Sequence, residues 1–191
     1  MSSFVKFLQG AGARIVPLVP NMSEEETRER LSKINGVFLP GGDGDYETYA
    51  RFLYKSIIEM NDNGTYIPLW GTCMGYEQIA NFTAENGDPN EHMYLTHESL
   101  PLHFINDPRD SKMYSSMSDQ AFLFENHNYT YNGHNWGIPP EKFLTDAGLE
   151  KMFTVTAISY LPEPDGRAFV ASIEGKTYPI FGTLFHPEMA S

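Results

Sequence analysis

One stretch of this 191-residue chain, residues 66–82, constrains the fold more than any other. An apolar run at 66–70 leads directly into Gly-Thr-Cys-Met-Gly at 71–75, and helix-compatible residues follow. This Gly-x-Cys-x-Gly pattern is typical of a nucleophile elbow, in which a strand turns sharply into a helix with a reactive side chain at the apex. Side chains at positions 71 and 75 would collide with the neighbouring strand and helix, which explains the two glycines. The pattern therefore predicts that Cys73 lies at the apex of a strained turn.

Cys73 is the only cysteine, which excludes a disulfide within the chain and a multi-cysteine metal site. The helix that follows it would aim free N–H groups and its positive dipole end at the sulfur. We therefore expect the thiolate to be favoured, with a thiol pKa below the usual value of about 8.5. The alternative is a lone buried cysteine that acts as a small apolar side chain. Spacing alone does not separate the two, so the rest of the chain must decide.

The composition indicates a single globular domain, residues 1–191, with 41% hydrophobic and 14% aromatic residues. A formal net charge of -12 argues against nucleic acid as a partner. No apolar run approaches the ~20 residues of a membrane span, and the first residues do not form a signal peptide. Four sequons, which matter only in a secreted protein, begin at Asn21, Asn63, Asn81 and Asn128. The compartment stays open on these grounds.

The first half of the chain alternates between expected helices and strands. Helices are expected at residues 4–9, 23–33 and 46–63 and after Cys73, and strands at 13–19, 36–40 and 66–72. Ser23 and Glu26 form a capping box at the start of the second helix. Such alternation predicts a parallel sheet with helices on both faces.

The second half breaks this rhythm. Residues 85–140 show no sustained period, and we expect irregular excursions and short helices over one end of the sheet. Three strands then follow, at about 153–160, 167–174 and 178–185, joined by short turns. The fold class is therefore α/β, with a mostly parallel central sheet, helices on both faces and a small antiparallel extension. Ligands of such sheets bind beyond the carboxyl ends of the strands.

The last expected strand ends in Phe-His-Pro-Glu, with His186 and Glu188 two residues apart. Residues at this spacing in an extended segment point the same way. A cysteine nucleophile needs a base, and that base needs an orienting carboxylate. His186 and Glu188 fit these two roles. Alone, however, they are better interpreted as a strand-end histidine and a solvated glutamate.

The loop at Pro40-Gly41-Gly42 could place backbone N–H groups against a substrate oxygen. With the N–H of Met74, Gly41 and Gly42 would form an oxyanion hole. A phosphate loop is the competing interpretation, but no Lys-Ser/Thr follows, and the acidic residues at 43–47 lack the downstream glutamate of a calcium loop. No metal site is expected, since His92, His97 and His103 have no metal-ligand spacing, and His127 is left out of the site.

Five motifs occur in one order and resemble the gamma-glutamyl hydrolase family, within the class I glutamine amidotransferase-like superfamily. They are Gly-Ala-Arg-Ile-Val-Pro-Leu, Phe-Leu-Pro-Gly-Gly, Pro-Leu-Trp-Gly-Thr-Cys-Met-Gly-Tyr-Glu, His-Asn-Trp-Gly-Ile and Phe-His-Pro-Glu. The resemblance covers nearly the whole chain and implies a flavodoxin-like, three-layer fold. It makes Cys73 the nucleophile, His186 the base and Glu188 the third member, with His134 beside the substrate. Glutaminase domains more often carry Gln where Glu77 stands here.

The resemblance implies a cysteine hydrolase of γ-glutamyl bonds in folate or antifolate polyglutamates, with no cofactor, no membrane partner and a homodimer. It also implies a lysosomal, vacuolar or extracellular location. The family has a further strand before the first helix and a further segment after His-Pro-Glu, and we expect this chain to lack both. Two alternatives stay open: a glutaminase domain that feeds ammonia to a synthase, and a truncated, non-catalytic remnant.

Overall fold

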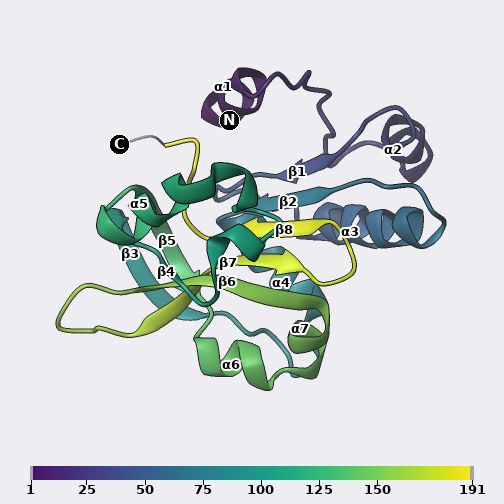
Figure 1. Ribbon diagram of the computed structural model, residues 1–191. Helices are drawn as coiled ribbons and strands as arrows, with labels where there is room; N and C mark the ends of the chain where they lie inside the picture. The colour runs from purple at the N-terminus through teal and green to yellow at the C-terminus, as the bar shows by residue number, and fades with distance from the viewer. Residues whose placement is uncertain (1, 190–191) are drawn as a thin grey trace.

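The computed structural model describes residues 2–189 and has a six-stranded mixed sheet at its centre (Figure 1). The sheet order is β1-β2-β8-β7-β6-β4, and β3 and β5 form a separate two-stranded sheet. The strands are β1 Val37–Leu39, β2 Leu69–Thr72, β3 Glu91–Leu100, β4 His103–Phe104, β5 Thr130–Gly137, β6 Phe153–Tyr160, β7 Ala168–Gly175 and β8 Ile180–Thr183. The helices are α1 Ser2–Gly10, α2 Glu24–Leu31, α3 Glu47–Asp62, α4 Met74–Thr83, α5 Leu123–Asn126, α6 Pro140–Thr145 and α7 Ala147–Met152, with 3-10 helices η1 Pro108–Asp110 and η2 Ser115–Phe122.

The sheet confirms the α/β class but is less parallel than the sequence suggested. β1, β2 and β8 pair in parallel, whereas β7, β6 and β4 add three antiparallel pairings. Parallel neighbours need a crossover, and α3 and α4 supply helical segments between successive parallel strands. The short turns after β6 and β7 instead allow direct antiparallel return. The antiparallel part is therefore half of the sheet and not a small extension.

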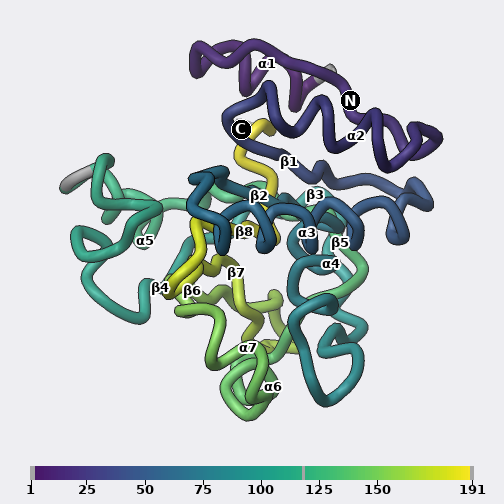
Figure 2. Tube along the Cα trace, turned by 90° about the vertical axis from the view of Figure 1, so that its right-hand side faces the viewer, coloured from purple at the N-terminus to yellow at the C-terminus, as the bar shows by residue number. Residues whose placement is uncertain are grey.

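Helical segments cover both faces of the sheet, in three layers. On one face α4 packs against β1, β2 and β8, α3 packs against α4, and Tyr76 of α4 is fully buried there. On the other face Phe4 of α1 packs against Phe38 of β1, and Tyr114, beside η2, donates its hydroxyl to Ser172 of β7. In Figures 1 and 2 the C-terminal segment runs from the sheet toward α1. This brings the two ends of the described chain to the same side of the sheet.

Local sequence signals explain several boundaries. The capping box is present, since the Ser23 hydroxyl accepts from the Glu26 N–H and the Glu26 carboxylate accepts from the Ser23 N–H. Helix α3 ends just before Gly64, whose φ of 83° suits only glycine well. The three closing strands lie close to the expected ranges, with β8 shorter than residues 178–185. Among the described residues no helix is long and apolar enough to cross a membrane.

Two expectations were wrong. Residues 13–19 form no strand and pair with none, with prolines at 17 and 20 and exposed Val16 and Val19. A strand exists only where a neighbour accepts its hydrogen bonds, and the outer edge of β1 has no partner strand among residues 2–189. Residues 85–140 are also more regular than expected, because β3 and β5 pair antiparallel there with two register shifts.

Candidate active site

Cys73 lies at the turn between β2 and α4, in the strained conformation that the elbow pattern predicts. Its φ of 52° and ψ of -116° are unusual for a residue with a side chain. A Cβ at Gly71 would lie 2.6 Å from the backbone of Gly75, and a Cβ at Gly75 would lie 2.2 Å from the Leu39 oxygen. The two glycines therefore let β2, α4 and β1 approach closely enough to hold the turn.

The Cys73 thiol is buried and uncharged in this structure, which corrects the expectation of a favoured thiolate. Burial, followed by the negative charge of Glu77, raises its pKa to about 12, although the Met74 N–H opposes this by hydrogen bonding. The sulfur lies 3.9 Å from the carbonyl oxygen of Gly133, a long thiol hydrogen bond. Burial and the nearby Glu77 carboxylate thus raise the thiol pKa by more than the helix N-terminus lowers it.

His186 and Glu188 contact one another beyond β8, as expected, but through a turn at residues 187–188 and not through an extended segment. Nδ1 of His186 donates to the Glu188 carboxylate at 2.7 Å, and the Glu188 side chain is only 2% exposed. This contact fixes the tautomer and leaves Nε2 free to accept a proton. The backbone N–H of His186 donates to the Tyr131 carbonyl of β5 at 2.8 Å, which anchors the segment to β5.

The Gly41 loop lies against both Cys73 and the His186 imidazole. A Cβ at Gly41 would lie 2.8 Å from Cβ of Cys73 and 3.0 Å from Cε1 of His186. Gly42 has a φ of 137°, a conformation that residues with a side chain rarely adopt. The Tyr46 hydroxyl donates to the Pro40 carbonyl and holds the start of this loop. Gly41, Gly42 and the Met74 N–H are thus gathered at one place, and their role in binding an oxyanion stays a prediction.

His134 of β5 is buried beside this group, only 4% exposed. Its Nδ1 donates to the Met93 carbonyl at 3.1 Å, and Nε2 has no hydrogen-bond partner among the described residues. Burial lowers its pKa to about 4, so the ring is neutral at pH 7 and Nε2 is an acceptor. Within residues 2–189 no cluster of three or more His, Cys, Asp or Glu side chains could hold a metal ion.

Two aromatic rings that the sequence did not predict, those of Phe4 and Tyr131, flank His186. The Phe4 ring of α1 lies 6.1 Å from the imidazole and is 8% exposed, and the Tyr131 ring lies edge-on at 6.1 Å. Phe4 was expected only as one apolar position on its helix. For Tyr131, the alternation of buried residues in β5 was the available signal, and it was hidden in a segment expected to be irregular.

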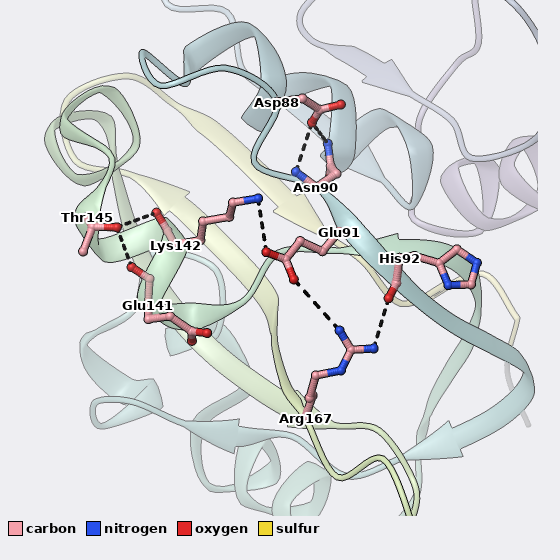
Figure 3. Close-up of polar contacts among 8 residues, drawn as sticks. All are labelled: Asp88, Asn90, Glu91, His92, Glu141, Lys142, Thr145 and Arg167. Atoms are coloured by element: carbon pink, nitrogen blue, oxygen red, sulfur yellow. Dashed lines mark hydrogen bonds and ion pairs between the residues drawn. The ribbon is translucent and has the colours of Figure 1, made fainter.

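A polar network anchors the far end of the β3–β5 sheet (Figure 3). Glu91, the first residue of β3, pairs with Lys142 of α6 at 3.2 Å and with Arg167 at 3.9 Å, and Arg167 also donates to the His92 carbonyl. Nearby, the Asp88 carboxylate accepts from the backbone and side chain of Asn90. Lys142 and Arg167 thus both pair with Glu91 at the start of β3.

Taken together, the fold and the gathered side chains define an α/β protein with a strand-to-helix cysteine and a hydrogen-bonded histidine–carboxylate pair at the carboxyl ends of parallel strands. Residues 5–191 match the family described as Glutamine amidotransferase class-I. The chain belongs to this family.

Curated relatives of the chain are named as hydrolases. The chain is 35% identical over 195 residues to gamma-glutamyl hydrolase B of Dictyostelium discoideum, covering 98% of this chain and 56% of that protein. It is 32% identical to the gamma-glutamyl hydrolase of Rattus norvegicus and 30% identical to that of Homo sapiens, covering 99% of this chain and 60% of each. The chain thus spans little more than half the length of these relatives.

Solved structures support the fold. The glutaminase domain of Trypanosoma brucei CTPS with bound acivicin superposes with a TM-score of 0.68 at 16% identity, covering 100% of this chain and 79% of that one. A putative GMP synthase protein from Thermoplasma acidophilum gives 0.60 at 20% identity, covering 98% and 78%. Identities this low indicate a shared fold, and they carry no activity to this chain.

Proposed function

We propose that this chain is a cysteine hydrolase that cleaves γ-glutamyl bonds of folate or antifolate poly-γ-glutamates through a thioester. The observation that carries the proposal is the contact of Glu188 with His186 beside the Gly41 loop and Cys73. The names of the curated relatives supply the bond type. The polyglutamate substrate follows from the sequence resemblance.

In the proposed reaction, the thiol proton moves to Nε2 of His186 as the sulfur attacks the γ-carbonyl carbon. Because the resting thiol has a pKa of about 12, deprotonation has to accompany the attack. The negative oxygen that forms accepts hydrogen bonds from N–H groups of the Gly41-Gly42 loop and of Met74. The C–N bond then breaks, and the His186 proton goes to the departing amine.

Water completes the cycle by attacking the thioester. His186 takes a proton from this water, the C–S bond breaks, and the proton returns to the sulfur of Cys73. Glu188 holds the imidazole in one tautomer and stabilises its charged form in both halves of the reaction. The residues need no metal or cofactor for these steps.

The location and assembly belong to the same proposal. By resemblance to the family, the protein acts in a lysosome, a vacuole or the extracellular space, and it forms a homodimer. An acidic compartment would also neutralise part of the carboxylate charge behind the net value of -12. This would ease the approach of a polyanionic substrate.

Purified protein incubated with pteroylpentaglutamate, and separately with free glutamine, separates the alternatives. A hydrolase releases glutamate or glutamyl peptides from the pteroyl substrate without a partner protein, and Cys73→Ala abolishes this release. Rapid glutamine turnover with no cleavage of γ-linked diglutamate would favour the glutaminase alternative. No turnover of either substrate by folded protein would favour the non-catalytic remnant.

A further inference from the structure

A second strained residue lies on β3, the strand that pairs with β5. Of the non-glycine residues that the structure describes, Cys73 and His97 have positive φ, and His97 has φ 56°. His97 sits in the register shift of β3 between Leu95 and Glu98, so a bulge turns its side chain out of the regular pleat. Strained backbone of this kind persists where surrounding contacts hold it, and it gathers at functional sites.

The bulge places His97 on the hydroxyl of Tyr131 in the paired strand. Nδ1 of His97 and the Tyr131 hydroxyl form a short hydrogen bond. The Tyr131 ring lies over Gly133 on the same strand: a Cβ at Gly133 would be only 3.8 Å from the Tyr131 hydroxyl oxygen. Gly133 is the residue whose carbonyl faces the Cys73 sulfur. Tyr131 and Cys73 thus both lie against Gly133, and the Tyr131 side chain is half-buried and partly open to solvent.

Tyr131 also contacts His186. Its ring meets the imidazole edge-on at 6.1 Å, and its backbone carbonyl holds the His186 N–H. The group that protonates a leaving amine must lie next to that amine, so this flank belongs to the leaving half of the substrate. When the leaving half is an amino acid, its α-carboxylate is two bonds from the amine.

The His97–Tyr131 pair always has a hydrogen-bond donor to spare. If the phenol donates to Nδ1, the Nε2–H of neutral His97 is free, and if Nδ1–H donates, the phenol proton is free. Donors next to a carboxylate form charge-assisted hydrogen bonds, which are stronger than neutral ones.

We propose that Tyr131 and His97 bind the α-carboxylate of the leaving glutamate and so make the enzyme select an acidic leaving residue. This inference rests on the proposed γ-glutamyl hydrolysis. Under this proposal, Tyr131 and His97 make the enzyme prefer γ-linked glutamate to amides that have an uncharged leaving group.

The test compares γ-glutamyl-glutamate with the matched dipeptide whose leaving residue carries an α-carboxamide in place of the α-carboxylate. The expected preference of the wild-type protein for the carboxylate, as a ratio of kcat/KM values, falls about tenfold or more in Tyr131→Phe. That variant keeps the ring on His186 and Gly133. His97→Asn tolerates the positive φ but is too short to reach the phenol, and it gives a similar fall.

Tyr129→Phe is the matched control, because Tyr129 is 49% exposed and stacks on His127 in a second tyrosine–histidine pair. It keeps the wild-type ratio. An unchanged ratio in Tyr131→Phe, or equal losses on both substrates, would overturn the proposal and leave a merely structural role.

A separate measurement distinguishes failure of this inference from failure of the proposed hydrolysis. Calorimetry of γ-glutamyl-glutamate binding to Cys73→Ala protein, with and without Tyr131→Phe, needs no turnover. If the wild-type protein cleaves neither dipeptide, the proposed hydrolysis fails. Tenfold weaker binding in the double variant would still support the carboxylate site, and equal or absent binding in both would reject it.

Discussion

The Glu188 carboxylate receives the Nδ1–H of His186 at 2.7 Å and is almost completely shielded from water. Burying a carboxylate beside a single neutral histidine costs desolvation energy. A positively charged imidazole ring would offset this cost. The second oxygen of Glu188, Oε2, has no hydrogen-bond partner among the described residues. The arrangement suits a histidine that gains and loses a proton in each turnover, and it is poorly suited to a purely structural contact.

Replacing Glu188 by Gln should therefore lower kcat by roughly 10³-fold while KM changes little, because the amide no longer stabilises the imidazolium or fixes its tautomer. His186→Asn should be worse. Steady-state kinetics on a γ-glutamyl substrate measure both, and Glu163→Gln, in an exposed turn, is the control. Equal loss of affinity in both variants would point to a binding role for the pair.

The reactivity of Cys73 should depend steeply on pH. With a thiol pKa of about 12, raised first by burial, the thiolate fraction rises tenfold per pH unit well below that value. Alkylation by iodoacetamide should therefore accelerate about tenfold per unit between pH 7 and 9.5, and substrate should protect. Mass spectrometry follows the single cysteine, and Cys73→Ala gives the blank. A rate that levels off below pH 8 would show that the structure overstates the effect of burial.

The sequence predicted those parts of the site that depend on short-range spacing. The elbow, the facing of His186 and Glu188, and the loop at Gly41 each follow from a turn or an alternation within a few residues. The residues that meet at the candidate site could therefore be named before any packing was known.

What the sequence did not reveal depends on contacts between distant segments. The thiol pKa was expected to fall, but burial by β5 and the Glu77 charge raise it. Phe4 comes to His186 from the other end of the chain. Residues 13–19 have a strand-like sequence, yet no neighbour pairs with them. These three features depend on which helices and strands pack together in the fold, and a local sequence pattern does not determine that packing.

Glu77 should make the stability of the fold depend on pH. Burial, and then the charge of Asp88, raise its pKa from 4.5 to about 7. Between these two values the folded state binds more protons than the unfolded one, so the free energy of unfolding falls as pH rises. Glu77 contributes at most about 3 kcal/mol to the free energy of unfolding. This contribution is fully present below pH 4.5 and is lost above about pH 7.

Glu77→Gln should remove this slope and also lower the thiol pKa of Cys73, because it deletes the nearby charge that raises it. Urea denaturation at pH 5, 6, 7 and 8 measures the slope, and iodoacetamide kinetics measure the thiol. Glu85→Gln, on the loop that follows α4, is the comparison. Parallel stability curves for Glu77→Gln and the wild-type protein would show that Glu77 is not the responsible group.

The last prediction concerns the outer edge of β1, which has no partner strand among residues 2–189. Alternate residues of a parallel strand bond to opposite neighbours, and Val37 donates to Pro68 beside β2, so the N–H and C=O of Phe38 face the open edge. Residues 13–19, which form no strand, expose Val16 and Val19, at 47% and 43%. Each buried backbone group without a partner costs roughly 1–3 kcal/mol, against about 5–15 kcal/mol for a whole domain.

An open, apolar edge of this kind invites pairing with another chain. We therefore expect residues 1–191 expressed alone to self-associate or to unfold weakly, with poor activity despite Cys73, His186 and Glu188. Val16→Lys combined with Val19→Lys replaces two exposed apolar side chains by charged ones and should reduce association, as light scattering would show. Adding a complementary strand to the chain should restore both cooperative unfolding and turnover. Monodisperse wild-type protein that unfolds cooperatively and hydrolyses γ-glutamyl bonds at an ordinary rate would contradict the argument, because the edge would then cost the fold nothing.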